Sequence, residues 1–292
     1  MTELSRRLQK IADRIDNGKT MADIGTDHGF LPIYLIENDI SPFVVMTDVS
    51  RPSLMKGSEN LDMLGADRSR ARFRVGDGIS VLDRGEVDTV VIAGMGGMLI
   101  RDIMSADFEL TCSFRKYILQ PRKRQGHLRK WLLENGFTII HEDLVEEGRF
   151  IPEIITALSP KAADDAEAEN PETEEIASEK PAAEKSAAGE AGTKEPGAGT
   201  DCRNTDSLQL CIKGTAFASP DDTGEDIIYR VPPWITQASG PVEDFLVKNI
   251  TSEQEKLENV MLAKERNMRL EDRICRGIRY LRDLLEEYRN GR

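Results

Sequence analysis

Carboxylates and glycines share one short segment near the start of the chain, Ala22-Asp23-Ile24-Gly25-Thr26-Asp27-His28-Gly29. The apolar residues before it predict the end of a strand, and the residues after Gly29 predict a helix. Glycines between a strand and a helix let a cofactor approach the backbone, because no side chain stands in the way. We therefore expect a cofactor loop here, and the carboxylate inside it, Asp27, is a candidate for chemistry.

Three further strand ends carry residues that suit a cofactor. Val44–Thr47 ends in Asp48, at the distance from the loop where a carboxylate hydrogen-bonds the ribose of a nucleoside cofactor. The alternative for Asp48 is a cap on the following helix. Gly76-Asp77-Gly78 follows the third strand, and Ala93-Gly94-Met95-Gly96-Gly97 closes the fourth with glycines that again allow close backbone approach. Many methyltransferases that act on a nucleobase carry an acid or Asn followed by Pro-Pro-aromatic at this point. This chain lacks that tetrapeptide, so it does not hold a base in that way.

The order of predicted elements is that of a doubly wound α/β sheet whose last strand is antiparallel. An amphipathic helix is expected over residues 4–15. Hydrophobic patterning then predicts strands at 21–24, 43–48, 71–75, 89–93, 116–120, 138–144 and 151–158, with helices at 29–38, 51–64, 97–106 and 124–135. The last two strands follow each other without a helix between them.

The rest of the chain divides into an acidic segment and a helical one. Residues 159–206 hold 5 basic and 13 acidic side chains and one large aliphatic residue, Ile176, so we expect a disordered insertion. Ordered structure is expected again at 207–217 and 227–234. Residues 242–288 predict two antiparallel helices with a turn near 265–269. The expected domains are therefore 1–158, the insertion 159–206 and a C-terminal segment, 207–292.

Composition narrows the class of protein. The net charge is −13, but most of it lies in the acidic insertion, so the total does not exclude a nucleic-acid partner. Four cysteines without a C-x-x-C pair argue against a zinc site or a disulfide framework and favour the cytoplasm. No apolar run approaches the ~20 residues of a membrane span. We expect no metal and no membrane partner. The oligomeric state stays open, with a monomer preferred.

Five motifs taken together resemble one family: Leu4-Ser5-Arg6-Arg7-Leu8, Ala22–Pro32, Gly76–Gly78, Ile92–Gly97 and Leu119-Gln120-Pro121. They are similar to the TrmK family, bacterial S-adenosylmethionine-dependent methyltransferases that act on N1 of adenine 22 in tRNA. The resemblance covers residues 4–158 and, more weakly, the C-terminal helices. It implies a Rossmann-like class I methyltransferase domain with a C-terminal coiled-coil-like helical domain, S-adenosylmethionine as cofactor and tRNA as partner. The chain departs from the family at Arg122, where Asn is common, and at Pro152, where an aromatic residue is common.

The resemblance also implies roles for single residues. The residues implied to contact the cofactor are Asp23, Gly25, His28, Gly29, Asp48, Asp77, Gly78, Ala93, Gly94 and Met95. Asp27 and Arg7 are implied on the catalytic side of the pocket, beside Gln120 and Pro121. Asp27 would hydrogen-bond the adenine amino group, whereas its alternatives are a helix cap or a contact to the cofactor. His28 either relays a proton or packs on the cofactor.

Basic residues suggest where a polyanion would bind. Residues 113–130 contain no acid, and their cations are expected to form a phosphate track that includes Arg122, Lys123, Arg124, Arg129 and Lys130. Basic residues also gather at 68–74 and at 6–14. The arginines between 266 and 282 recur at helical spacing and either contact RNA or pair within the helix. For every basic group the alternative is a solvated surface with local ion pairs.

Two other functions stay open at this point. The chain could be a methyltransferase that acts on a small molecule or a protein and shares only its cofactor-binding half with the TrmK family. It could also be a non-catalytic, cofactor-binding adaptor whose helical pair recruits partners.

Overall fold

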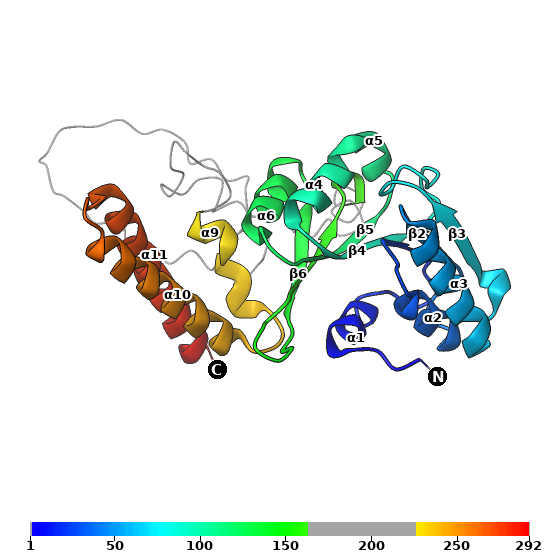
Figure 1. The fold of residues 1–292 in the computed structure, drawn as a ribbon, viewed down its shortest axis with the longest axis horizontal. Coiled ribbons are helices and arrows are strands. Elements are labelled where there is room, and N and C mark those ends of the chain that lie inside the picture. Colours follow the sequence, from blue (N-terminus) through cyan, green and yellow to red (C-terminus); the bar gives the residue numbers. More distant parts are fainter. Residues whose placement is uncertain (1, 163–225, 292) are drawn as a thin grey trace, which may run out of the picture.

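The computed structural model describes residues 2–162 and 226–291 (Figure 1). Its centre is one seven-stranded sheet with the order β3-β2-β1-β4-β5-β7-β6. The strands are β1 (Met21–Ile24), β2 (Val44–Asp48), β3 (Ala71–Val75), β4 (Thr89–Met95), β5 (Lys116–Pro121), β6 (Thr138–Leu144) and β7 (Glu153–Leu158). Only β7 runs against its neighbours, β5 and β6. The expected doubly wound sheet with an antiparallel last strand is confirmed.

Helices cover both faces of the sheet. They are α1 (Arg6–Ala12), α2 (Phe30–Glu37), α3 (Arg51–Leu64), α4 (Gly97–Ala106), α5 (Phe108–Thr111) and α6 (Gln125–Glu134). Successive strand residues point to opposite faces, so Ile92 packs in one core with α4 and α6, while Val91 packs in a second core with α1, α2 and α3. Every helix predicted between strands is present. The short α5 was not predicted.

The carboxyl ends of the parallel strands meet at one edge of the sheet. In register, Ile24 at the end of β1 pairs with Thr47 of β2 and with Ile92 of β4. The strand order reverses between β1 and β4, and in such sheets ligands bind in the crevice outside the strand ends at that point. The fold therefore gathers the loops after β1, β2, β4 and β5 around one crevice.

The C-terminal part is a helical pair joined to the sheet by a short segment. The segment contains α9 (Ile227–Arg230) and the 3-10 helix η3 (Pro233–Gln237), and the pair is α10 (Val242–Leu262) and α11 (Met268–Asn290). Arg289 near the end of α11 pairs with Glu243 near the start of α10 at 2.6 Å, so the two helices are antiparallel. The helical pair is confirmed, with its turn at 263–267. Its coiled-coil character stays a prediction.

The predicted ordered stretch 207–217 and most of the predicted insertion 159–206 lie outside the described residues. Ser159 and Ala162 are buried, and the Ser159 amide donates to the Arg115 carbonyl at 3.1 Å. The sheet domain therefore continues past Leu158. Within residues 2–162 and 226–291, no helix has the length and apolarity that a membrane crossing requires.

Candidate active site

The loop after β1 is folded tightly against the end of β2. The amides of Gly25 and Thr26 both donate to the Thr47 carbonyl at 2.9 Å. Gly25 has φ 76°, a left-handed conformation that favours glycine, and a Cβ there would lie 2.3 Å from the Met95 Cε. The backbone conformation therefore favours glycine at this position, the Met95 side chain packs against it, and the two cofactor loops predicted from sequence lie together.

Asp23 supports this loop from the buried side. Its buried carboxylate accepts a hydrogen bond from the Thr26 hydroxyl at 2.7 Å. Burial raises the pKa of Asp23 to about 6, the Thr26 hydroxyl opposes the rise, and the charge of Asp48 adds to it. Asp23 therefore shapes the loop from inside the fold.

Asp48 sits at the end of β2 and holds two loops. One carboxylate oxygen accepts the Ser50 amide at 2.8 Å, and the other accepts the Asp27 amide at 3.4 Å. The N-cap of α3 is Ser50, whose hydroxyl accepts the Ser53 amide, so the alternative role of Asp48 as the helix cap is wrong. A carboxylate oxygen accepts more than one hydrogen bond, so Asp48 retains acceptor capacity for a diol at the crevice.

Asp27 and His28 lie on the open side of the loop. The Asp27 backbone has φ 47°, and its exposed carboxylate lies 2.8 Å from the His28 Nδ1 and 3.9 Å from the Lys56 Nζ. The N-cap of α2 is Gly29, which has no side-chain cap, so the capping alternative for Asp27 is wrong. The His28 ring stacks on Phe30, with ring centroids 5.6 Å apart.

Helix α3 contributes two residues that the sequence did not single out. Lys56 approaches Asp27, and the Asn60 side chain donates to the His28 carbonyl at 2.9 Å. The two lie four residues apart and so share one face of α3. Their spacing was visible, but nothing in the sequence showed that this face meets the loop. Gly57 between them leaves room for Gly29, where a Cβ would lie 3.2 Å from the Gly57 Cα.

Gln120 joins α1 to the end of β4. Its buried side-chain oxygen accepts Arg7 Nη1 and the Gly94 amide, both at 3.1 Å. Arg7 and Gln120, both predicted for the methyl-transfer pocket, therefore lie together, although 113 positions separate them in the sequence. Gly94 has φ 77°, and a Cβ there would meet only the Arg122 guanidinium, at 3.8 Å. The backbone at Gly94 is thus open to a ligand, which fits a bound cofactor.

The remaining predicted cofactor residues lie in turns at the same edge. The Gly76 amide donates to the Asp48 carbonyl at 3.0 Å, so the turn that holds Asp77 and Gly78 is tied to the end of β2. The Arg122 amide donates to the Met95 carbonyl at 2.7 Å, which sets the turn after Pro121 beside Ala93-Gly94-Met95. The loops that carry the predicted cofactor residues therefore meet at one edge of the sheet, with Asp23 buried beneath them. Their contacts to a cofactor stay a prediction.

A family model described as a methyltransferase domain matches residues 4–155. The chain belongs to this family. A Bacillus subtilis protein named tRNA (adenine(22)-N(1))-methyltransferase is 35% identical over 155 residues, which cover 53% of this chain and 65% of that protein.

Two solved structures resemble nearly the whole of this chain in fold. The B. subtilis m1A22 tRNA methyltransferase TrmK has a TM-score of 0.68 and 22% identity, with 98% of this chain and 100% of that one covered. The M. capricolum TrmK in complex with S-adenosyl-homocysteine has a TM-score of 0.63 and 18% identity, with 97% and 99% covered. At these identities the likeness shows the fold, including the helical C-terminal part. The resemblance to the TrmK family is confirmed.

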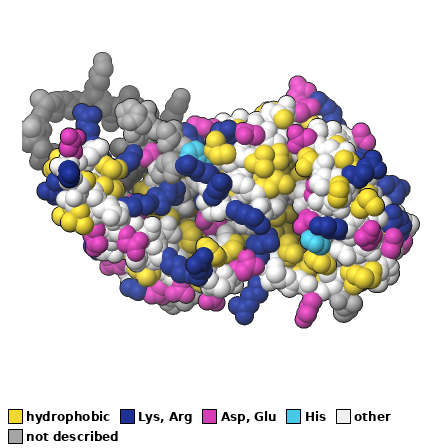
Figure 2. All heavy atoms as spheres, viewed as in Figure 1, with side chains coloured by type: hydrophobic (Ala, Val, Ile, Leu, Met, Phe, Trp, Pro, Cys, Tyr) yellow, Lys and Arg dark blue, Asp and Glu magenta, His cyan; other side chains and the backbone are white. Residues whose placement is uncertain are grey.

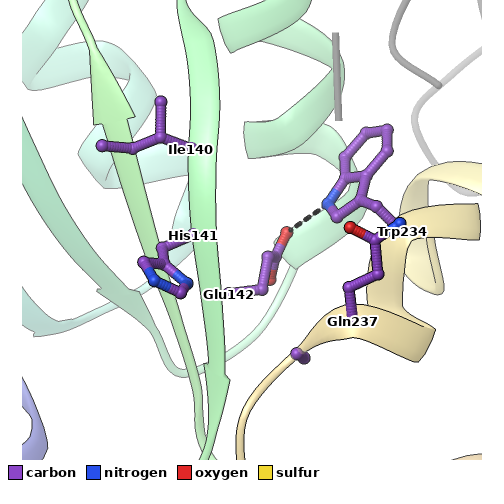
Figure 3. Close-up of a pocket in the computed structure, with 6 residues that line it drawn as sticks. Ile140, His141, Glu142, Trp234 and Gln237 are labelled. Atoms are coloured by element: carbon purple, nitrogen blue, oxygen red, sulfur yellow. Dashed lines mark hydrogen bonds between the residues drawn. The ribbon is translucent and has the colours of Figure 1, made fainter. Parts of the chain in front are cut away.

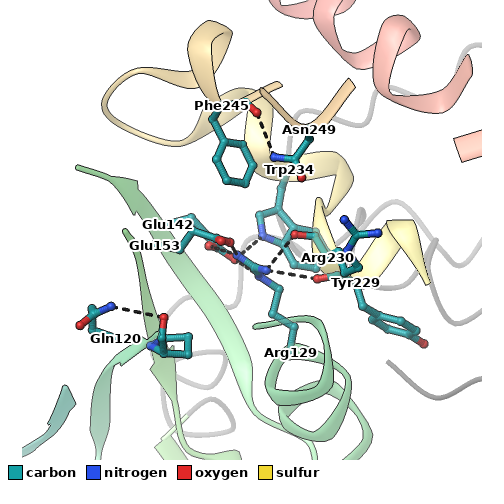
Figure 4. Close-up of polar contacts among 10 residues, drawn as sticks. Gln120, Arg129, Glu142, Glu153, Tyr229, Arg230, Trp234, Phe245 and Asn249 are labelled. Carbon is teal, nitrogen blue, oxygen red and sulfur yellow. Dashed lines mark hydrogen bonds and ion pairs between the residues drawn. The ribbon is translucent and has the colours of Figure 1, made fainter. Parts of the chain in front are cut away.

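The prediction that Arg129 contacts substrate is wrong. Its guanidinium is fully buried and bonds to both Glu142 oxygens at 2.8 Å and to Glu153 at 2.6 Å (Figure 4). It also donates to the carbonyls of Tyr229 and Arg230 at 3.2 Å. Arg129 therefore ties α6 and the sheet of this methyltransferase to α9.

Other cations of the predicted phosphate track divide between surface and structure. Arg122, Lys123 and Arg124 are exposed in the turn after β5, at the crevice edge. Lys130 lies 2.6 Å from Glu134 and over the Tyr229 ring, with only 17% of its side chain exposed, so it is not an open phosphate contact. Lys116 begins β5 at the opposite edge of the sheet and pairs with Asp16. Of the predicted phosphate track, the exposed cations that remain candidates for RNA contact at the crevice edge are those of the 122–124 turn.

Two other basic groups serve the fold of this methyltransferase. Arg70 bonds to the carbonyls of Ile36 and Ser41, and Arg74 pairs with Glu86 at 2.6 Å. On α1 and just after it, Lys10 and Arg14 face Asp143 of β6, with Arg14 at 2.5 Å. For these residues the ion-pair alternative is correct.

The six arginines between 266 and 282, on α11 and just before it, are more open. Arg276 pairs with Asp272 at 3.1 Å, and Arg266 pairs with Glu271 at 2.9 Å. The other four are exposed and have no ion pair with any described residue: Arg269, Arg273, Arg279 and Arg282. Figure 2 shows Lys and Arg side chains gathered across the middle of one face, between the helical pair and the sheet domain.

A cavity of about 230 Å³ lies away from the crevice, between β6 and η3 (Figure 3). Its lining is Ile140, His141, Glu142, Trp234, Gln237 and Ala238, and none of these is a predicted site residue. The Trp234 indole donates to Glu142 at 3.2 Å, so one wall of the cavity belongs to the Arg129 cluster. Among the described residues, no group of His, Cys, Asp and Glu suits a metal ion.

Proposed function

We propose that this chain transfers the methyl group of S-adenosylmethionine to N1 of adenine 22 in tRNA. One observation carries the proposal: Arg7, Gln120 and the exposed 122–124 turn share the crevice edge with the cofactor loops. The predicted cofactor loops thus adjoin a turn with exposed cations, among them Arg122 and Lys123, which suits a polyanionic substrate. The name of the B. subtilis relative supports adenine 22 as the target. A tRNA substrate places the enzyme in the cytoplasm.

The cofactor residues fit the donor by their chemistry. In this proposal Asp48 offers carboxylate oxygens to the two ribose hydroxyls, and Asp77, in the turn tied to the end of β2, contacts the adenine edge. Gly25 and Gly94 expose backbone where side chains would stand in the way. When bound, S-adenosylmethionine supplies an electrophilic methyl group on a sulfonium. The loops hold that group still against the incoming base.

The target nitrogen needs no base to activate it. N1 of neutral adenine carries a lone pair, so the chain must orient the ring and stabilise the positive charge that develops on it. We infer that Asp27, exposed at the crevice, accepts a hydrogen bond from the adenine amino group. Its charge then lies beside the cationic product. Arg7, fixed by Gln120, completes the wall of the pocket.

RNA is bound at two places in this proposal. Arg122, Lys123 and Arg124 hold phosphates close to the target adenine. The open arginines of α11, among them Arg273 and Arg279, hold a more distant part of the tRNA. The Arg129 cluster fixes the two surfaces relative to each other, because it joins α6 to α9.

Product analysis tests the proposal. The chain is incubated with unmodified bulk tRNA and methyl-labelled S-adenosylmethionine, and the RNA is digested to nucleosides and separated by mass. Label in N1-methyladenosine is expected. Label in another nucleoside, or only in protein or small molecules, would show that the substrate is not the proposed one. Tight cofactor binding without any transfer would favour the adaptor function. Asp27→Asn should keep cofactor binding and lose transfer about 100-fold.

A further inference from the structure

An exposed aromatic ring stands at the tip of the hairpin between β6 and β7. The Phe150 side chain is 62% exposed, against 41% for Phe30 and 38% for Phe108, the other exposed phenylalanines of the described residues. The Arg149 guanidinium lies over this ring, 4.9 Å from its centroid. The exposed ring is thus a flat apolar surface with a cation on one of its faces, and its other face is available for stacking on a nucleobase.

The hairpin lies at the crevice edge. Because β7 is antiparallel to both β5 and β6, β6 runs parallel to β5, and the hairpin after β6 leaves the sheet at its carboxyl edge. Arg7 connects it to the pocket, since its Nη1 bonds to Gln120 and its Nε lies 3.7 Å from Glu147. Glu146 lies 4.0 Å from Arg6. Both hairpin acids are therefore balanced by arginines, and an RNA strand does not meet an unpaired anionic wall.

The hairpin holds the ring in a defined place. Glu147 and Phe150 exchange backbone hydrogen bonds of 3.0 and 3.1 Å across Gly148, whose φ is 61°. The Val145 amide donates to the Pro152 carbonyl at 3.0 Å, and Lys248 of α10 donates to the Arg149 carbonyl at 3.5 Å. A ring fixed in this way loses little further entropy when a flat partner stacks on it.

We propose that Phe150 stacks on the unpaired nucleobase that flanks the target adenine on the same strand, while Arg149 covers the other face of the ring. This inference rests on the proposed function. An adenine whose N1 reacts must leave its stack, which also exposes the base beside it, and aromatic rings receive such bases in RNA-binding proteins. Gln120 contacts Arg7, Arg7 contacts Glu147, and Glu147 pairs with Phe150 through the backbone, so Phe150 lies beyond the target pocket, as a contact to the flanking base requires. The absent Pro-Pro-aromatic clamp leaves this role open.

The test combines kinetics with a fluorescent base. Phe150→Ala and Phe150→Trp are compared with wild type on a tRNA transcript that contains adenine 22. 2-Aminopurine is placed, in separate transcripts, at each position that flanks adenine 22. Met63→Ala is the control, because Met63 is 76% exposed at the far end of α3, away from the crevice edge. Cofactor affinity is measured for each variant and should stay unchanged.

Loss of the ring should raise KM and lower kcat/KM about 10-fold, since stacking on a base adds to RNA binding. The tryptophan variant should restore both values. In the complex, 2-aminopurine at one flanking position should be quenched by wild type and by the tryptophan variant, and bright with Phe150→Ala. Met63→Ala should match wild type.

Two results would overturn the inference while the proposed function stands. One is wild-type kinetics and quenching with Phe150→Ala. The other is a loss that Phe150→Trp does not restore, with no change in quenching, which would make the ring only a support of the hairpin. If wild type methylates no RNA but still quenches the flanking base through Phe150, the proposed function fails and the stacking stands. If wild type binds no RNA, both fail.

Discussion

Replacing Arg129 by Met tests the conclusion that this residue joins the two parts of the molecule. The substitution removes a guanidinium that contacts Glu142, Glu153 and two carbonyls of α9. Two carboxylates that are almost fully buried then lose their cation. Breaking a buried pair by removing one partner costs about 3–5 kcal/mol, because the remaining charge is buried without compensation. Arg129→Met should therefore lower the free energy of unfolding by about 3–5 kcal/mol.

Urea denaturation followed by tryptophan fluorescence measures this loss. The chain has two tryptophans, and Trp234 touches the cluster through Glu142, so a Trp131→Phe background isolates its signal. Lys130→Met is the matched control. It removes an i,i+4 pair with Glu134 and a cation–π contact with Tyr229 but strands no buried charge, so it should cost clearly less than Arg129→Met, about 1 kcal/mol. Adding Glu142→Gln and Glu153→Gln to Arg129→Met should recover part of the loss, because the uncompensated charges are gone.

One result would refute the reasoning. If Arg129→Met unfolds within about 1 kcal/mol of wild type but binds tRNA more weakly, Arg129 does not support the junction and belongs to an RNA-contacting surface after all. Burial of the guanidinium excludes that outcome in the present structure.

Three further predictions concern the crevice. Burial raises the pKa of Asp23 to about 6, so between about pH 4 and 6 the folded chain keeps a proton that the unfolded chain has released. The free energy of unfolding should therefore fall by about 3 kcal/mol as the pH rises through that range. Asp23→Asn should lack this fall when unfolding is measured at each pH. Gly25→Ala should cost stability and at least about 10-fold in cofactor affinity by calorimetry, whereas Gly65→Ala, with a similar φ and no close neighbour, should cost stability alone. Arg122→Gln with Lys123→Gln should reduce the salt slope of tRNA binding by about 2 and leave cofactor affinity unchanged; an unaltered slope would remove this turn from the RNA surface.

The sequence predicted the sheet well because its signals are local. Apolar runs that end in glycine turns mark strands and helices, and the limits of the first, third and sixth strands agree with the structure. Loops that follow parallel strands must meet at one edge, so the order of elements was enough to bring Gly25, Asp48 and Gly94 together. Arg7 and Gln120 were joined through the family resemblance, since no local pattern links residues so far apart.

The sequence could not show which charges are paired in three dimensions. Spacing placed Arg129 and Lys130 in one basic stretch. The partners of Arg129, the buried Glu142 and Glu153, lie on β6 and β7, and no local pattern links them to it. Lys116 pairs with Asp16, which lies 100 positions away in the sequence. Arg70 donates to backbone carbonyls, and a sequence pattern does not show which carbonyl will accept. A cation is available to RNA only if no such partner holds it, and that depends on tertiary packing.

The most direct measurement of the central claim is transfer of labelled methyl to a single tRNA transcript. One transcript carries adenine at position 22, and a matched one carries guanine there. Incorporation into the first and not the second is predicted, with Asp27→Asn about 100-fold slower than wild type on the first. Equal incorporation into both transcripts, or none into either while the cofactor binds, would contradict the assignment of adenine 22.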